Sequence, residues 1–284
     1  MTALGKNDPQ YQAVDAALQE WRQGDCVLGE QWFMYRFDPE LPLTKESTAV
    51  AGEGGDLAES AVEGFVVLTQ TCDIVRKNTE RPFIEVAPIV EVSEQVVHEI
   101  ARGRRPLYAV IPTLRAQRLV ADLDRTMTVE KAVVAKWPRT AGCRTDEEAR
   151  RFSLALTRKR ARFAFPDDFT AFTGKLQSRL QERHDRQSDE GRALRALREI
   201  RVRAAPSWDA VEVELTFWFI REDDASDFEG KSWSDLLEVW LQLIPISGRF
   251  RPVQGVVIML EDLTAKDYVE SDPLDLDHLS TRGE

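Results

Sequence analysis

The residues best suited to chemistry in this 284-residue sequence follow a short apolar run, Phe65–Leu68. Two hydroxyls, an amide, a thiol and a carboxylate stand side by side, and a guanidinium follows at Arg76. A loop that leaves a rigid strand is a common place for binding and catalytic groups. We therefore predict a binding segment here. Its members are Gln70, Thr71, Cys72 and Asp73, with Thr69 at the strand exit.

A catalytic role for this segment would need Cys72 as a nucleophile, activated by a base that forms its thiolate. His98 is the one histidine in the same expected domain, and it does not neighbour Cys72 in sequence. The structural alternative is that Thr71 and Asp73 cap a turn or a helix beginning at Ile74, with Cys72 as a small buried hydrophobe. The histidines are scattered and the sequence has no CxxC, so no metal is expected. It also has no nucleotide or hydrolase motif, so no cofactor is expected.

A second candidate is a dense basic run with phenylalanines at its end. The net charge is about −8 over residues 1–130, +9 over 131–205 and −12 over 206–284. Basic groups neutralise phosphates and aromatic rings stack on bases, so residues 150–162 are a candidate RNA or DNA site. The alternative is a solvated or interdomain face. The basic candidates are Arg158, Lys159, Arg160 and Arg162, followed by Phe163 and Phe165.

The elements that must position these groups fall into three segments of an α+β protein. Residues 1–130 contain short strand-like runs without long alternating helices, which predicts a small antiparallel β-barrel. Within it, residues 38–60 are rich in Gly, Pro, Ser and acid and predict a long flexible loop. Residues 131–205 predict a basic helical segment, with helices from Thr145 to Pro166 and over 167–184.

The last segment, 206–284, predicts an acidic α/β unit. Residues 211–220 alternate between apolar and other side chains, which is typical of a half-buried strand. An amphipathic helix over 232–243 and a strand over 253–263 follow. The acidic tail, 268–284, carries interleaved leucines and is expected to dock on the basic helices of its own chain, with a partner or disorder as alternatives.

Three short stretches of the first segment resemble the PemK/MazF-type barrel of toxin ribonucleases. These are Gly24–Val27, Phe65–Thr69 and Val86–Ile89, within residues 24–92. The resemblance implies a compact antiparallel barrel and endoribonuclease activity. The family places an Arg before the second of these strands to stabilise the transition state. This chain has Glu63 and Gly64 there, and a carboxylate would repel a scissile phosphate.

The leading hypothesis is therefore a non-enzymatic binding or regulatory component with a protein partner, of a bacterial defence or toxin-like system. One alternative is an endoribonuclease using Thr69, Thr71 or Asp73 with Arg76 or Arg81. Another is a nucleic-acid-binding module worked by the basic helical segment. The N-terminus lacks a signal pattern and no apolar run is long enough to span a bilayer, so a cytoplasmic protein without membrane contact is expected.

Overall fold

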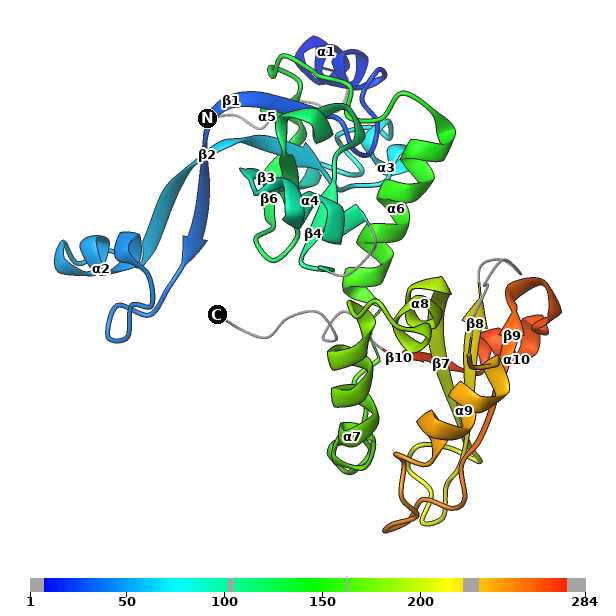
Figure 1. Cartoon of the computed structure of the whole chain (residues 1–284). Coiled ribbons are helices and arrows are strands. Elements are labelled where there is room, and N and C mark those ends of the chain that lie inside the picture. Colours follow the sequence, from blue (N-terminus) through cyan, green and yellow to red (C-terminus); the bar gives the residue numbers. More distant parts are fainter. Residues whose placement is uncertain (1–7, 102–104, 162, 222–229, 275–284) are drawn as a thin grey trace. The chain divides into compact units, whose positions relative to one another are not determined.

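The computed structural model describes residues 8–101, 105–161, 163–221 and 230–274. It divides the chain into two compact units, Met1–Ala161 and Arg162–Glu284, and the expected α+β class is confirmed (Figure 1). This division differs from the three expected segments, because the basic helical region does not form a unit of its own. Helix α6 (Asp146–Arg160) buries Phe152 in the first unit, whereas α7 (Asp167–His184) buries its apolar side in the core of the second.

The first unit is built on a six-stranded antiparallel sheet in the order β1-β2-β3-β5-β4, with β6 paired to β3. Its strands are β1 (Cys26–Arg36), β2 (Leu57–Val67), β3 (Phe83–Glu91), β4 (Tyr108–Val110), β5 (Leu119–Asp122) and β6 (Met127–Glu130). In the described residues no pairing joins β4 back to β1, so a closed barrel is not found.

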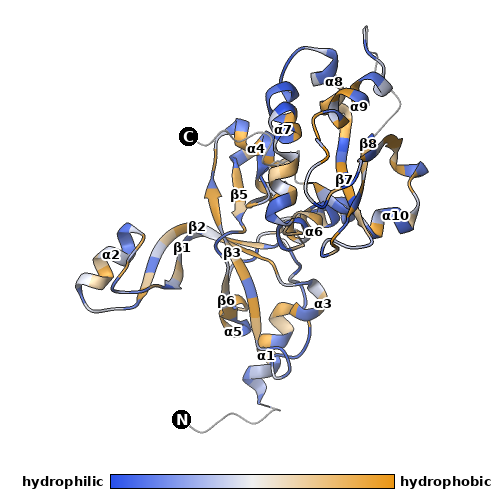
Figure 2. Cartoon of the chain, turned by 90° about the horizontal axis from the view of Figure 1, so that it is seen from below, coloured by the Kyte–Doolittle hydropathy of each residue, from blue (hydrophilic) through white to orange (hydrophobic). Residues whose placement is uncertain are grey.

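Apolar side chains fill both faces of this sheet. On one side Leu18 and Trp21 pack with Phe65, whose ring stacks on Trp137 at 5.9 Å. On the other side Phe152 of α6 packs with alternate residues of the same strands. The short elements that complete the unit are α1 (Pro9–Leu18), α3 (Thr71–Ile74), α4 (Glu94–Ala101), the 3-10 helix η1 (Pro112–Gln117) and α5 (Lys131–Val134). Figure 2 shows the apolar central strands with these elements around them.

The outer halves of β1 and β2 leave the body of this unit as a two-stranded ribbon, seen in both Figure 1 and Figure 2. We call residues 31–62 the arm; its end carries helix α2 (Lys45–Gly52). The expected flexible loop over 38–60 is therefore wrong at α2 and from Leu57 onward. Thr44 caps α2 in a reciprocal capping box with Ser47, and ladder bonds to β1 fix the returning strand.

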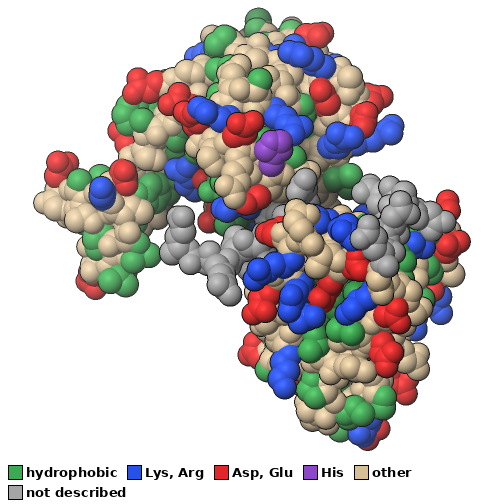
Figure 3. Space-filling model, in the orientation of Figure 1, with side chains coloured by type: hydrophobic (Ala, Val, Ile, Leu, Met, Phe, Trp, Pro, Cys, Tyr) green, Lys and Arg blue, Asp and Glu red, His purple; other side chains and the backbone are tan. Residues whose placement is uncertain are grey.

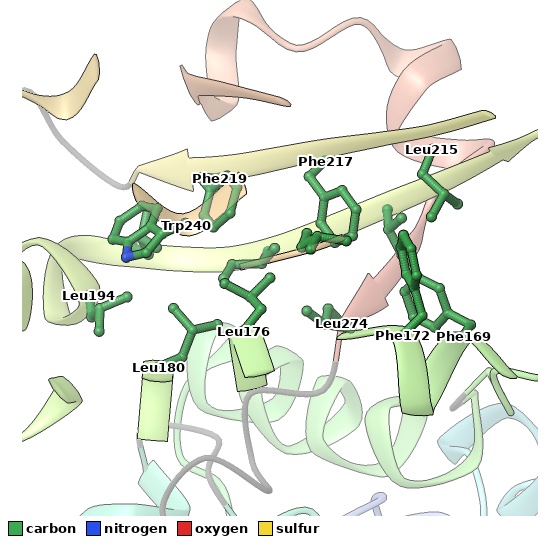
Figure 4. Packing of buried hydrophobic residues seen from close by; sticks show 14 of the residues in the cluster. Phe169, Phe172, Leu176, Leu180, Leu194, Leu215, Phe217, Phe219, Trp240 and Leu274 are labelled. Atoms are coloured by element: carbon green, nitrogen blue, oxygen red, sulfur yellow. The ribbon is translucent and has the colours of Figure 1, made fainter. Parts of the chain in front are cut away.

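The second unit is a four-stranded sheet, β10-β7-β8-β9, in which only the β8–β9 pair is parallel. Its strands are β7 (Leu197–Ala205), β8 (Glu214–Arg221), β9 (Gln254–Met259) and β10 (Asp272–Leu274). Helices α7, α8 (Asp189–Ala196) and α9 (Trp233–Leu241) pack on one face, where their apolar residues meet those of β8 (Figure 4). The expected alternation is confirmed at Leu215, Phe217 and Phe219, which are buried.

Two details of β8 differ from the expectation. The strand begins at Glu214, and Val211 is 87% exposed. Trp218, expected on the polar side, is buried, and the guanidinium of Arg203 lies over its ring at 5.3 Å. The guanidinium covers this ring and is attracted to its face, so an aromatic side chain is buried on the second face as well.

The acidic tail is docked on its own unit as far as residue 274. After the 3-10 helix η2 (Leu260–Asp262) and α10 (Ala265–Val269), β10 pairs with β7, and Leu274 enters the core. The indole nitrogen of Trp208 donates to Asp272 Oδ2 at 2.8 Å. The docking surface is thus a strand edge, which corrects the expectation of the basic helices. Residues 275–284 lie outside the described residues.

Candidate functional site

The turn that leaves β2 is held by its own hydroxyls. Thr69 Oγ1 accepts a hydrogen bond of 2.7 Å from the backbone N–H of Glu85, and Thr71 Oγ1 accepts one of 3.1 Å from the N–H of Gln23. The amide of Gln23 also donates to the carbonyl oxygen of Leu68 at 2.7 Å. Both threonines predicted as site residues therefore use their oxygen atoms to fix the backbone around the strand exit.

The same turn exposes its other side chains. Gln70 and Cys72 are exposed, and Cys72 Sγ lies 3.7 Å from Gln70 Oε1. The alternative in which Cys72 is a buried hydrophobe is therefore wrong, because α3 turns this side chain toward solvent. Within the described residues, no group of His, Cys, Asp and Glu is arranged to hold a metal ion.

A guanidinium does approach the predicted carboxylate. Arg76 Nη1 lies 3.6 Å from Asp73 Oδ1, with side chains 52% and 39% exposed. At that exposure and separation the pair is a screened surface contact. Arg81 is exposed in the turn before β3. The two hollows discussed below include none of these residues.

Beneath the turn lies a buried ammonium that the sequence analysis did not identify. Lys131 is 1% exposed, and its Nζ donates to the carbonyl oxygens of Asp73 at 2.9 Å and Arg76 at 2.5 Å. Burial lowers the pKa of Lys131 from its usual 10.5, while the carboxylates of Asp15 and Asp73 act in the opposite direction. The ammonium thus closes the last turn of α3, as cations do at helix C-termini.

The Gly24-Asp25 pair, which carries part of the family resemblance, also has a structural role. Asp25 is buried, and its Oδ2 accepts from Arg139 Nε at 2.7 Å and from the backbone N–H of Arg22 at 2.8 Å. Its other oxygen lies 3.4 Å from the N–H of Gly142. This carboxylate joins the start of β1 to the chain before α6, so it is not available to a ligand.

The basic run is largely engaged within the first unit. Lys159 Nζ bonds to Asp124 Oδ1 at 2.8 Å, and Arg160 forms a short ion pair with Glu85. The carboxylate of Glu85 raises the pKa of Arg160. Arg158 also has an interaction, and Arg162 lies outside the described residues. These pairs favour a role for the run in seating α6 over a role in binding phosphates.

The phenylalanines that follow the run are part of the second unit. Phe163 and Phe165 pack edge to face at 5.2 Å, and both contact the ring of Trp208. Phe163 remains 38% exposed. Since these rings pack against one another, they are not free platforms on which bases could stack.

The arm presents several of the large apolar side chains that the first unit exposes to solvent. Trp32, Met34 and Leu57 share one face of the ribbon and are 50%, 47% and 53% exposed. At the tip Leu41 and Leu43 are 68% and 86% exposed, and Figure 3 shows hydrophobic side chains open to solvent there. Sequence reasoning missed this surface because it treated residues 38–60 as a flexible loop.

The opposite face of the arm borders a hollow of about 450 Å³ within the first unit. Phe33 and Tyr35 stack along it at 5.8 Å, and the guanidinium of Arg125 lies 5.7 Å from the Phe33 ring. In the second unit a shallow hollow follows Leu237 and Leu241 of α9. Neither hollow brings together groups with an evident catalytic relation.

Comparisons with protein-family models, curated proteins and solved structures found no match to this chain. No helix in the described residues is both long and apolar enough to cross a bilayer.

Proposed function

We propose that this chain is a non-enzymatic binding component and that the arm is the surface through which it binds protein. The observation that carries the proposal is the row of half-exposed Trp32, Met34 and Leu57 on one face of the ribbon. Large apolar side chains gathered on an exposed surface mark interaction sites, and Trp and Met are enriched at protein interfaces. A projecting ribbon presents such a face without obstruction from its own unit.

The strand exit supports the non-enzymatic part of the proposal. The hydroxyl oxygens of Thr69 and Thr71 accept hydrogen bonds from backbone N–H groups. Asp73 and Arg76 form an exposed ion pair. Phosphodiester cleavage requires charge stabilisation aimed at a bound phosphate in a site that excludes water. The exposed Gln70 and Cys72 remain a candidate secondary contact for the partner.

The PemK/MazF-like resemblance remains part of the proposal. The stretches that carry it are neighbours in the sheet, where Cys26 pairs with Val66 and Val66 with Ala87. A barrel-like scaffold that kept this arrangement without the family's Arg would suit a binding or regulatory member of a toxin-like system. The arm would then give this chain a contact surface beyond the compact scaffold.

A photo-reactive amino acid in place of Trp32 tests the proposal. Irradiation of cells that express this variant is expected to give covalent adducts with protein. The matched control carries the same group at Leu154 of α6, which is 65% exposed but lies on the basic helix. Adducts with RNA from position 154 would favour the nucleic-acid alternative. A lack of protein adducts from position 32 would contradict the proposal.

A further inference from the structure

Strand β1 is an edge strand of the first unit's sheet. Its outer half, Gln31–Arg36, pairs with Leu57–Val62 on one side. In the described residues the other side of β1 is bridged only near its start, between Cys26 and Thr140. The backbone groups along the outer edge are therefore open to another strand, and an edge of this kind is a template for strand addition.

Several of the usual protections are missing from this edge. Natural edges carry lysine, proline or a bulge that blocks a new neighbour. Here the irregularity in pairing lies before Gln31, and the stretch from Gln31 to Arg36 contains neither Lys nor Pro. Trp32 and Met34, which protrude along this stretch, are about half exposed. An added strand would cover one flank of both side chains.

The order of side chains along the edge is self-complementary. Glu30 and Arg36 stand three residues before and three residues after Phe33, and Trp32 and Met34 lie immediately on either side of it. If two such edges run antiparallel about Phe33, each Glu30 lies across from an Arg36, and each Trp32 across from a Met34. Opposite charges and large apolar pairs directly across a ladder both stabilise it.

We propose that the occupant of this edge is a second copy of the chain, with β1 paired to β1 antiparallel and Phe33 at the two-fold axis. The inference rests on the proposed function, because it names the partner of the arm. An isologous contact repeats every favourable pair twice, which an unrelated strand would not do. Because one short strand from each copy makes the contact, we expect it to bury less than the roughly 1,600 Å² of a standard interface, and we expect the dimer to dissociate in the micromolar range.

Sedimentation equilibrium of the purified full-length chain at micromolar concentrations tests this pairing. Glu30→Arg puts an arginine across from Arg36 in each of the two symmetry-related pairs, so attraction becomes repulsion in both. We expect the dissociation constant of the dimer to rise about tenfold. The double variant Glu30→Arg/Arg36→Glu is expected to recover most of the loss. Arg36→Glu is measured alone as well, because Arg36 also pairs with Asp56 of its own chain.

The matched control is Glu59→Arg, which makes the same charge change on β2. Glu59 lies across from Met34 on the other strand of the ribbon and is exposed, but it is not on the β1 edge. The dissociation constant of the Glu59→Arg dimer is expected to stay at the wild-type value. Equal weakening by Glu59→Arg and Glu30→Arg would show a general charge effect and would overturn the pairing.

A disulfide trap fixes the register. In a Cys72→Ser background, the combined Trp32→Cys and Met34→Cys variant is expected to form a covalent dimer under mild oxidation, and each single variant much less. A chain that stays monomeric overturns the inference, and so does a dimer whose dissociation constant is unchanged by Glu30→Arg. If that monomer still gives adducts with another protein from position 32, the proposed function survives; if it gives none, both fail.

Discussion

The ammonium of Lys131 lies beneath the turn that follows β2 and donates a hydrogen bond of 2.9 Å to the carbonyl oxygen of Asp73. The two residues are 58 positions apart in sequence, and this contact seats the predicted site segment on the first unit. Lys131→Met is expected to lower the free energy of unfolding by about 1–3 kcal/mol, since carbonyl oxygens lose their donor. Urea denaturation measures the change, and Lys136→Met, at an exposed position five residues further along and without these bonds, serves as control.

The same variant makes a pH prediction. Burial lowers the pKa of Lys131 from 10.5, so the unfolded chain keeps this proton to higher pH than the folded chain does. Stability from this group therefore rises with pH in the window that ends at 10.5 and begins at the lowered pKa. The deficit of Lys131→Met relative to wild type is expected to grow across that window. A deficit that is constant with pH would contradict the lowered pKa.

The buried carboxylate of Asp25 depends on Arg139, whose Nε lies 2.7 Å from it. Arg139→Ala leaves this charge without its cation, and we expect the free energy of unfolding to fall by about 3 kcal/mol. Arg139→Lys keeps the charge but loses the guanidinium geometry, so its free energy of unfolding should fall less. Comparable losses in chemical denaturation for both variants would assign the effect to geometry instead of charge.

The cysteines are expected to differ sharply in reactivity. Cys72 is exposed, Cys26 is buried, and burial raises the pKa of Cys143 to about 11. Since the thiolate is the reactive form, iodoacetamide near neutral pH should modify Cys72 first. Mass spectrometry of the folded chain should show one fast adduct, which disappears in Cys72→Ser. Fast labelling of Cys26 would contradict the packing at the start of β1.

Because β10 is part of the second unit's sheet, we expect truncation of the tail to lower stability once it removes this strand. A chain that ends after Leu274 keeps β10 and serves as the reference. A chain that ends after Ser271 loses the bond from Trp208 to Asp272 and the burial of Leu274. We expect the second unit to lose about 3 kcal/mol, from one Leu side chain and one hydrogen bond. Equal stability of the two truncated chains would show that β10 adds nothing.

Incubation of the pure chain with mixed RNA is expected to leave the RNA intact. The reason is that the hydroxyls of Thr69 and Thr71 are engaged and that Asp73 and Arg76 form an exposed pair. Gel electrophoresis checks this. Cleavage that disappears in both Asp73→Ala and Arg76→Ala would replace the proposed function with the endoribonuclease alternative.

Local patterns predicted the elements that depend on neighbouring residues. Thr145 before three acidic residues marked the start of α6, and the alternation around Phe217 marked β8. Helix α2 was missed because its Gly, Ser, Thr and Ala content resembles a linker. It is held by the Thr44–Ser47 capping box and by the strands on either side of it. Such support comes from pairing partners that are distant along the chain.

The candidate site was predicted only in part for the same reason. The sequence indicated a polar strand exit at Thr69–Asp73, and the turn lies there. It gave no sign that Lys131 supports the turn, that the backbone N–H of Glu85 donates to Thr69 Oγ1, or that the Glu85 carboxylate pairs with Arg160. These contacts join residues from separate strands and helices, which no periodicity reveals.

The arm has a further consequence for local opening. In the described residues, β2 pairs with β3 only at Phe65–Val67. In the arm, therefore, Gln31–Arg36 and Leu57–Val62 pair only with each other. Isolated two-stranded ribbons are marginal in water. Amide protons of the arm should therefore exchange with deuterium sooner than those of Val86 in the sheet centre, by fluctuations that leave the rest of the unit folded. A strand bound along the free edge would slow that exchange, and the arm's own protection thus reports whether it is occupied.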